Sequence, residues 1–190
     1  MSLALVVLAL VTLQRLGELV LARRNTRALL ARGAYEVAGE HYPLIVALHA
    51  AWLIGLWALA WDNSVSLPWL GVFVVLQSLR VWVIATLGRR WTTRIIVLPG
   101  APLVTGGPFR FLPHPNYAVV AAELAVLPLA FGLPEYGLLF SVLNALVLFV
   151  RIEAEARALA PSREPNPAAQ KPAARASVAT VSPAPSAATS

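Results

Sequence analysis

The chain is organised around residues 110–117, which read Arg-Phe-Leu-Pro-His-Pro-Asn-Tyr. This short polar stretch follows Gly106-Gly107-Pro108 and lies between two long apolar segments. The apolar segment after it contains one acid, Glu123, roughly two helical turns beyond Tyr117. A polar loop bounded by apolar runs of this length is typical of a membrane protein whose loop lies at the lipid surface.

The composition also indicates a membrane protein. Of the 190 residues, 58% are hydrophobic and 13% are charged, whereas a soluble domain has about 25% charged residues. The chain has no cysteine, which excludes disulfides, thiolate metal sites and a cysteine nucleophile. The net charge is +6, but the basic residues form no single patch, so nucleic-acid binding is not expected. The three histidines are far apart in sequence, so no metal site is expected either.

We expect an all-α integral membrane protein with five transmembrane helices. The expected spans are residues 3–22, 43–61, 65–88, 117–133 and 136–150. No basic residue precedes the first apolar run, which disfavours a cleaved signal peptide. Residues 23–42 are basic and partly amphipathic, so we expect them to lie along the membrane interface. Residues 94–98 are mostly β-branched and predict a small hairpin or an extended cap.

The distribution of charge predicts how the chain is oriented in the membrane, and composition divides it into a membrane domain and a tail. With the N-terminus outside and the C-terminus inside, the cytoplasmic segments are residues 23–42, 89–116 and 151–190. They hold all of the fifteen Lys and Arg residues except Arg15 and Arg80, as the preference of positive charge for the cytoplasmic side predicts. Residues 1–159 form the expected membrane domain, and residues 160–190, rich in Ala, Pro and Ser, are expected to be disordered.

Several polar side chains fall at one depth within the expected spans, roughly 9–11 Å from their inner ends. They are His49, Glu123 and Asn144, with Arg15, Glu18 and Arg80 in a similar slab. Ionisable groups in hydrocarbon are costly and usually face the bundle interior, so we expect a polar cavity at the cytoplasmic side. The alternative to a polar cavity is that each side chain has a separate structural role: the arginines reach the lipid headgroups, and His49 makes a hydrogen bond to a neighbouring helix. For Glu123, whose side chain is short, we favour a functional role.

Three pieces of the sequence resemble the isoprenylcysteine carboxyl methyltransferase family, which also includes phospholipid methyltransferases. They are the stretch from Gly106 to Tyr117 with its His-Pro-x-Tyr core, the pair of apolar spans that follows, and residues 151–159, Arg-Ile-Glu-Ala-Glu-Ala-Arg-Ala-Leu. Residues 14–52 are similar to a bacterial branch of the family, some of whose members O-methylate long-chain alkylpyrones and alkylresorcinols. Two departures are that Pro113 stands where the family usually has Arg, and that Glu153 and Glu155 split the usual acidic pair.

The resemblance implies S-adenosylmethionine as the methyl donor, bound between residues 105–117 and the segment after the last span. The implied cofactor-binding residues are Gly106, Gly107, His114, Pro115, Tyr117 and Glu155. Glycines allow the backbone to approach a ligand closely, and a carboxylate suits an amino group or ribose hydroxyls. The alternatives are that the glycines only form a turn, that Tyr117 only anchors the interface, and that Glu155 lies on a solvated helix face.

For the acceptor, we expect His49 and Arg151 to bind it, and Arg151 and Glu123 to act in catalysis. The expected function is O-methylation of a membrane-embedded lipophilic acceptor, either an isoprenylcysteine carboxylate or a polyketide-derived hydroxyl. The expected location is the bacterial inner (plasma) membrane, with the active site facing the cytoplasm. The alternatives are a phospholipid N-methyltransferase and a non-enzymatic membrane scaffold or transporter subunit.

Overall fold

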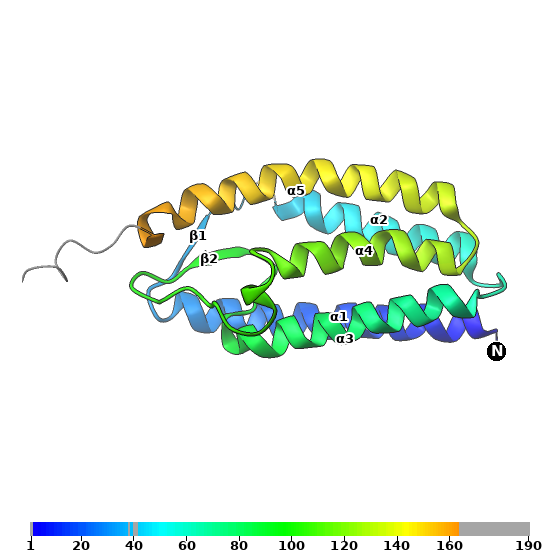
Figure 1. The fold of residues 1–190 in the computed structure, drawn as a ribbon, viewed down its shortest axis with the longest axis horizontal. Helices are drawn as coiled ribbons and strands as arrows, with labels where there is room; N and C mark the ends of the chain where they lie inside the picture. The colour runs from blue at the N-terminus through cyan, green and yellow to red at the C-terminus, as the bar shows by residue number, and fades with distance from the viewer. Residues whose placement is uncertain (1, 38, 40–41, 164–190) are drawn as a thin grey trace, which may run out of the picture.

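The structure is a computed structural model that describes residues 2–37, 39 and 42–163, with side chains through residue 153. Its elements, in chain order, are α1 (Leu3–Leu30), β1 (Tyr35–Val37), α2 (Tyr42–Ala60), α3 (Leu67–Leu87), η2 (Gly88–Arg90), β2 (Ile95–Val97), η3 (Gly107–Arg110), α4 (Pro115–Ala130) and α5 (Pro134–Arg163). The five α-helices run side by side along one long axis (Figure 1). The expected disordered tail lies outside the described residues from position 164 onward.

Four helices are long and apolar enough to cross a membrane: Leu3–Leu30, Tyr42–Ala60, Leu67–Arg90 and Pro134–Glu153. The remaining expected span, residues 117–133, corresponds to α4, which has only 16 residues. At 1.5 Å per residue α4 is about 24 Å long, shorter than a hydrocarbon core of about 30 Å. The mostly helical membrane fold is as expected, but four described helices, not five, reach full spanning length.

The basic segment after the first span differs from the expectation. It does not form a separate interfacial helix, because α1 continues without a break through Leu30. Its polar residue Asn25 is buried and its Nδ2 donates hydrogen bonds to the carbonyl oxygens of Gly88 at 3.2 Å and Trp91 at 2.8 Å. These bonds hold the last turns of α1 against η2. The chain then turns at Gly33, whose φ of +86° suits glycine.

The β-branched run forms an extended cap by pairing with a distant segment. β2 pairs antiparallel with β1, with Tyr35 opposite Val97 and Val37 opposite Ile95. The Arg94 guanidinium, just before β2, lies 2.7 Å from the Glu36 carboxylate and 4.3 Å from the centre of the Tyr42 ring. The small sheet therefore joins the connection before α2 to the connection after α3.

The two ends of the bundle are different. The N-terminus and the short turns before α3 and α5 lie at one end, and β1, β2, η2 and η3 lie at the other (Figure 1). At the first end, Asn63 Nδ2 donates to the Phe131 carbonyl at 3.0 Å and Ser2 Oγ donates to the Trp61 carbonyl at 2.8 Å. The described connections at the other end carry the basic residues Arg32, Arg89, Arg90, Arg94 and Arg110.

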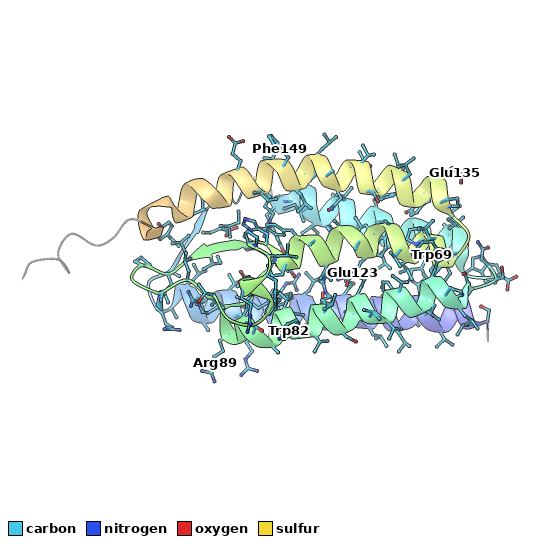
Figure 2. The ribbon with its side chains drawn as sticks, in the orientation of Figure 1. Trp69, Trp82, Arg89, Glu123, Glu135 and Phe149 are labelled. Carbon is cyan, nitrogen blue, oxygen red and sulfur yellow. The ribbon has the colours of Figure 1, made fainter. Side chains whose placement is uncertain are left out.

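The apolar core joins all five helices, and α4 lies between α3 and α5 (Figure 1). Its fully buried side chains include Leu8, Trp52, Leu56, Leu124, Leu127 and Phe131. Large apolar side chains also cover the outside of the bundle, where Phe149 is 73% exposed. Figure 2 shows Phe149 and Arg89 projecting outward, and Glu123 between the helices. An apolar exterior around a core that contains charge is typical of a protein surrounded by lipid.

Candidate functional site

A cavity of about 320 Å³ is lined by residues of all five α-helices and of the segment that follows η2. Its apolar wall includes Leu16, Leu19, Ile45, Leu53, Val120, Val147 and Leu148, and its polar side chains include Thr12, Arg15, His49, Thr93, Asn116, Tyr117, Asn144 and Arg151. Pockets that bind small molecules have volumes of about 300–1,000 Å³ and mainly apolar walls with a few polar groups. The composition of this wall suits an amphiphilic ligand.

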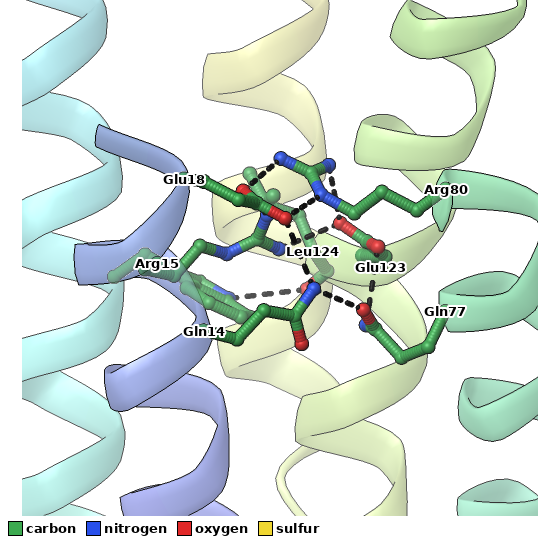
Figure 3. A network of polar contacts seen from close by, with 8 residues as sticks. Gln14, Arg15, Glu18, Gln77, Arg80, Glu123 and Leu124 are labelled. Carbon is green, nitrogen blue, oxygen red and sulfur yellow. Dashed lines mark hydrogen bonds and ion pairs between the residues drawn. The ribbon is translucent and has the colours of Figure 1, made fainter. Parts of the chain in front are cut away.

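A network of charged side chains borders the cavity (Figure 3). Arg15 NH2 lies 2.6 Å from Glu123 Oε2, and Arg80 NH1 lies 3.1 Å from the same oxygen. Both arginines also contact Glu18, Arg15 through NH1 at 3.2 Å and Arg80 through Nε at 2.5 Å. The two positive and two negative charges balance, which reduces the cost of placing them in a low-dielectric bundle.

Two glutamines complete this ion network. Gln77 Nε2 donates to Glu123 Oε1 at 3.1 Å, and Gln14 Nε2 donates to Glu18 Oε1 at 3.0 Å and to Gln77 Oε1 at 2.6 Å. Through these contacts α1, α3 and α4 are tied together at one depth. The Glu123 side chain is 0% exposed and does not line the cavity, although we expected it to be catalytic. The structure places it as a shared counter-ion of Arg15 and Arg80.

His49 lines the cavity and has one ring nitrogen bound by its own helix. His49 Nδ1 lies 2.8 Å from the carbonyl oxygen of Ile45, one turn earlier in α2. Because a carbonyl oxygen only accepts hydrogen bonds, Nδ1 is the donor, and in the neutral ring Nε2 then carries the lone pair. We considered a hydrogen bond from His49 to a neighbouring helix. The structure shows instead that Nδ1 is bonded within α2.

Arg151, Tyr117 and His114 meet near the β1–β2 end of the bundle. Arg151 Nε donates to the Tyr117 hydroxyl at 2.9 Å, and Arg151 NH2 donates to the Thr93 carbonyl at 2.7 Å. The Tyr117 ring stacks on the His114 ring with centroids 5.4 Å apart and 13° between the planes. Arg151 and Tyr117 line the cavity, whereas His114 lies behind Tyr117 and does not line it. Three of the expected site residues are thus brought together.

Three other expected cofactor residues, Gly106, Gly107 and Pro115, lie in the loop and at the start of α4, outside the cavity wall. Gly107 has φ +58°, and a Cβ there would lie 2.6 Å from Thr86 Oγ1, so glycine is required by backbone and packing. A Cβ at Gly106 would meet nothing within 4 Å. Pro115 is buried in the first turn of α4, a position that suits proline. Glu155 belongs to α5, and its side chain lies beyond the described ones.

Three buried polar atoms lack a hydrogen-bond partner within the described part of the chain. They are Trp91 Nε1, Asn116 Oδ1 and Asn144 Nδ2. All three residues line the same cavity. Most buried polar groups are bonded, so each exception needs an explanation, and a polar ligand or water in the cavity would supply one. Trp91 was missed from the sequence, because a tryptophan near the membrane boundary more often indicates an interfacial anchor.

No metal cluster is found in the part of the chain that the structure describes. Among the side chains described, those of residues 2–37, 39 and 42–153, no group of three or more His, Cys, Asp or Glu is placed to hold an ion. Three of the titratable side chains that line the cavity make specific contacts: His49 with the Ile45 carbonyl, Glu18 with Arg80, and Tyr117 with Arg151. The arrangement is suited to binding an amphiphilic molecule and orienting its polar head.

Comparisons with known proteins place the chain among relatives of similar size. Residues 69–161 match the isoprenylcysteine carboxyl methyltransferase family. "Uncharacterized protein YpbQ" of Bacillus subtilis (strain 168) is 39% identical over 157 residues, covering 80% of this chain and 94% of the relative. An "Uncharacterized protein" of Haemophilus influenzae (strain Rd) is 27% identical over 151 residues, which cover 76% of this chain and 88% of the relative. No solved structure gives a significant match. The chain therefore belongs to the isoprenylcysteine carboxyl methyltransferase family, and this membership suggests a membrane methyltransferase.

Proposed function

We propose that the protein transfers a methyl group from S-adenosylmethionine to an oxygen atom of a lipophilic acceptor that enters the cavity from the bilayer. One observation carries the proposal: Asn116 and Tyr117 of the family motif share an apolar-walled cavity with Arg151, which lies near the C-terminal end of the last span. Family membership supports methyl transfer, and the apolar helices support a membrane location. The acceptor is either a prenylcysteine carboxylate or a lipid-borne hydroxyl.

The residues at this end of the cavity fit the methyl donor. S-Adenosylmethionine offers an amino group, a carboxylate, ribose hydroxyls and an adenine ring. The unpartnered Asn116 Oδ1 can accept from an amino or hydroxyl group, and Trp91 Nε1 can donate to a carboxylate or hydroxyl oxygen. Tyr117 offers an aromatic face, and His114 supports that ring from behind. The further contacts that we propose between the protein and the donor, in the loop and in the helices, are Gly106, Gly107, Pro115 and Glu155. When bound, the donor supplies a methyl group on a positively charged sulfur.

The protein's own residues provide position and exclude water. Arg151, held by Tyr117 and the Thr93 carbonyl, fixes a guanidinium at the cavity wall, where it can orient the acceptor's polar head. The apolar wall holds the acceptor's tail. Holding two reactants in one orientation can lower a barrier by several kcal/mol, about 7–11 kcal/mol in well-oriented cases. Glu123 acts as a positioning residue, because it is not part of the cavity wall and contacts that wall through Arg15 and Arg80.

We also propose that the end carrying β1, β2, η2 and η3 faces the cytoplasm of a bacterial inner membrane. The support is the concentration of basic residues in the described connections at that end. The absence of native cysteine allows a direct test. A single cysteine at Ala101 should react with a membrane-impermeant maleimide in inside-out vesicles only, and one at Asn63 in right-side-out vesicles only. The reverse pattern would contradict the orientation.

The test of the activity uses purified protein in lipid nanodiscs with methyl-labelled donor. Three acceptors are supplied separately: a prenylcysteine, a long-chain alkylphenol and phosphatidylethanolamine. The proposal expects label in the prenylcysteine or the phenol, loss of that label in Arg151→Ala, and retention in Glu135→Gln, whose side chain is exposed at the far end. Label only in phosphatidylethanolamine would establish the N-methyltransferase alternative. No donor binding and no transfer would favour a non-enzymatic scaffold or transporter subunit.

A further inference from the structure

Besides His49, the cavity wall carries six titratable or charged side chains, drawn from all five helices. They are Arg15 and Glu18 of α1, Tyr42 of α2, Arg80 of α3, Tyr117 of α4 and Arg151 of α5. Glu18 is occupied: its Oε1 accepts from Gln14 and Arg80, and its Oε2 accepts from Arg15 and Arg80. Arginines do not accept protons at neutral pH. Among the described residues of this wall, His49 is therefore the group suited to take a proton from a ligand.

His49 is also held in the form that such a base requires. The bond from Nδ1 to the Ile45 carbonyl, 2.8 Å long, assigns the ring hydrogen to Nδ1. Nε2, across the ring from this bond, is then the atom with a free lone pair. A base whose second nitrogen is bound to a carbonyl keeps both its tautomer and its ring orientation.

Asn144 supplies a second, independent observation. It lines the same cavity from α5, the residue is 2% exposed, and among the described residues its Nδ2 finds no hydrogen-bond partner. An unbonded amide N–H in a buried wall is costly unless a ligand oxygen accepts from it. A hydroxyl oxygen can accept from Asn144 while its own hydrogen points to His49. A carboxylate has no hydrogen to give, so it would make no use of the lone pair on Nε2.

We propose that His49 is the general base of this cavity, with Asn144 as the donor that holds the acceptor oxygen, and that the acceptor group is a hydroxyl. This inference rests on the proposed methyl transfer and names its acceptor class. The acceptor O–H gives its proton to His49 Nε2 as the oxygen bonds the methyl carbon. The bond between that carbon and sulfur breaks, and its electron pair stays on sulfur as a neutral thioether. The positive charge passes to the imidazolium ring, which then releases the proton to water.

The experiment uses a series of long-chain alkylphenols with the same tail and ring substituents of increasing acidity. A simple phenol has a pKa of about 10 and is protonated at neutral pH, whereas a nitro-substituted one is largely ionised. In wild-type protein all should be methylated. His49→Gln should lower kcat for the simple phenol by about 100-fold or more, and the loss should shrink steadily as the phenol becomes more acidic. KM should change little across the series.

A second readout is independent of activity. Nitrogen-15 NMR of histidine-labelled protein in nanodiscs, assigned by the signal that His49→Gln removes, should show His49 protonated at Nδ1 and unprotonated at Nε2. Hydrogen on Nε2 of the neutral ring would overturn the assignment. So would an equal loss of kcat for every phenol, which is the result of a purely structural role. Failure of the wild-type protein to methylate any phenol, with transfer to the prenylcysteine intact, would overturn the hydroxyl class and leave the proposed function standing.

Discussion

Arg15 NH2 and Glu123 Oε2 lie 2.6 Å apart, although the two residues are 108 positions apart in the sequence. The contact joins α1 to α4 and is one of several that balance two arginines against two glutamates. The side chains of Glu123 and Arg80 are 0% and 7% exposed, so removing Glu123 leaves its arginine partners short of a counter-ion in a largely buried setting. The pair therefore contributes to both the stability of the bundle and the shape of the cavity wall.

Removing Glu123 should destabilise the protein strongly. Glu123→Leu leaves Arg15 and Arg80 with one carboxylate between them, and losing one partner of a buried ion pair costs about 3–5 kcal/mol. Thermal unfolding in detergent should show a large fall in Tm. Arg15→Leu combined with Glu123→Leu should recover part of it, because the charges balance again. Glu135→Gln, at an exposed site, is the control. An unchanged Tm in Glu123→Leu would mean that the network does not stabilise the bundle.

Two buried asparagines should respond differently to the same change. Asn25 donates to the carbonyls of Gly88 and Trp91, so Asn25→Leu removes both bonds and should lower Tm, although the Gly88 carbonyl still accepts from the Trp91 N–H. Asn144 Nδ2 has no partner in the described part of the chain, so Asn144→Leu should leave Tm unchanged or raise it while methyl transfer falls. Unfolding and methyl-transfer assays on both variants check this. A fall in Tm of Asn144→Leu as large as that of Asn25→Leu would show that Asn144 is structural.

Alanine substitutions at the two glycines of the loop should have different effects on stability. Gly107→Ala combines a φ of +58° with a Cβ 2.6 Å from Thr86 Oγ1, and we expect a loss of about 1–3 kcal/mol in unfolding free energy. Adding Thr86→Ala should restore the part that comes from the clash. Gly106→Ala meets open space and should keep Tm unchanged. Weaker donor binding in Gly106→Ala at unchanged Tm would identify a cofactor contact; unchanged binding would remove Gly106 from the proposed site.

Methyl transfer should depend on the two hydrogen bonds that the Arg151 guanidinium donates, and not only on its positive charge. Lysine cannot donate at once to the Tyr117 hydroxyl and the Thr93 carbonyl as Arg151 does. Arg151→Lys should lower kcat/KM by about 10-fold or more, and Tyr117→Phe by less, since Arg151 then loses the bond from Nε, worth about 1 kcal/mol, and keeps the one to the Thr93 carbonyl. Steady-state kinetics on both variants gives the comparison. Full activity in Arg151→Lys would show that charge alone is sufficient at this position.

The sequence predicted the parts of the fold that depend on local pattern. Apolar runs located the helices, and the β-branched run before Pro99 located β2. The length of α1 was underestimated, because the polar residues from Arg23 onward gave no sign that Asn25 would be buried against η2. The pairing of β1 with β2 was likewise not visible, since it joins segments separated by two spanning helices.

The sequence identified many residues of the candidate site but not the contacts that they make with one another. Charge and depth placed Arg15, Glu18, Arg80 and Glu123 in one layer, yet spacing alone does not say which of them face the cavity. The structure uses Glu123 to neutralise the arginines and leaves His49 and Asn144 on the wall. Trp91 entered the site through tertiary packing, because it follows η2 and is held by Asn25 through its carbonyl.

The most direct test of the central claim is to fill the cavity and measure methyl transfer. Val120 lines the cavity on α4, and Val142 is 52% exposed on the outer face of α5. Val120→Trp and Val142→Trp place the same bulky side chain inside and outside the cavity. With labelled donor and an acceptor that the wild-type protein methylates, the account predicts that Val120→Trp loses transfer while remaining folded, and that Val142→Trp retains it. Wild-type transfer by a folded Val120→Trp protein would contradict the claim that the reaction occurs in this cavity.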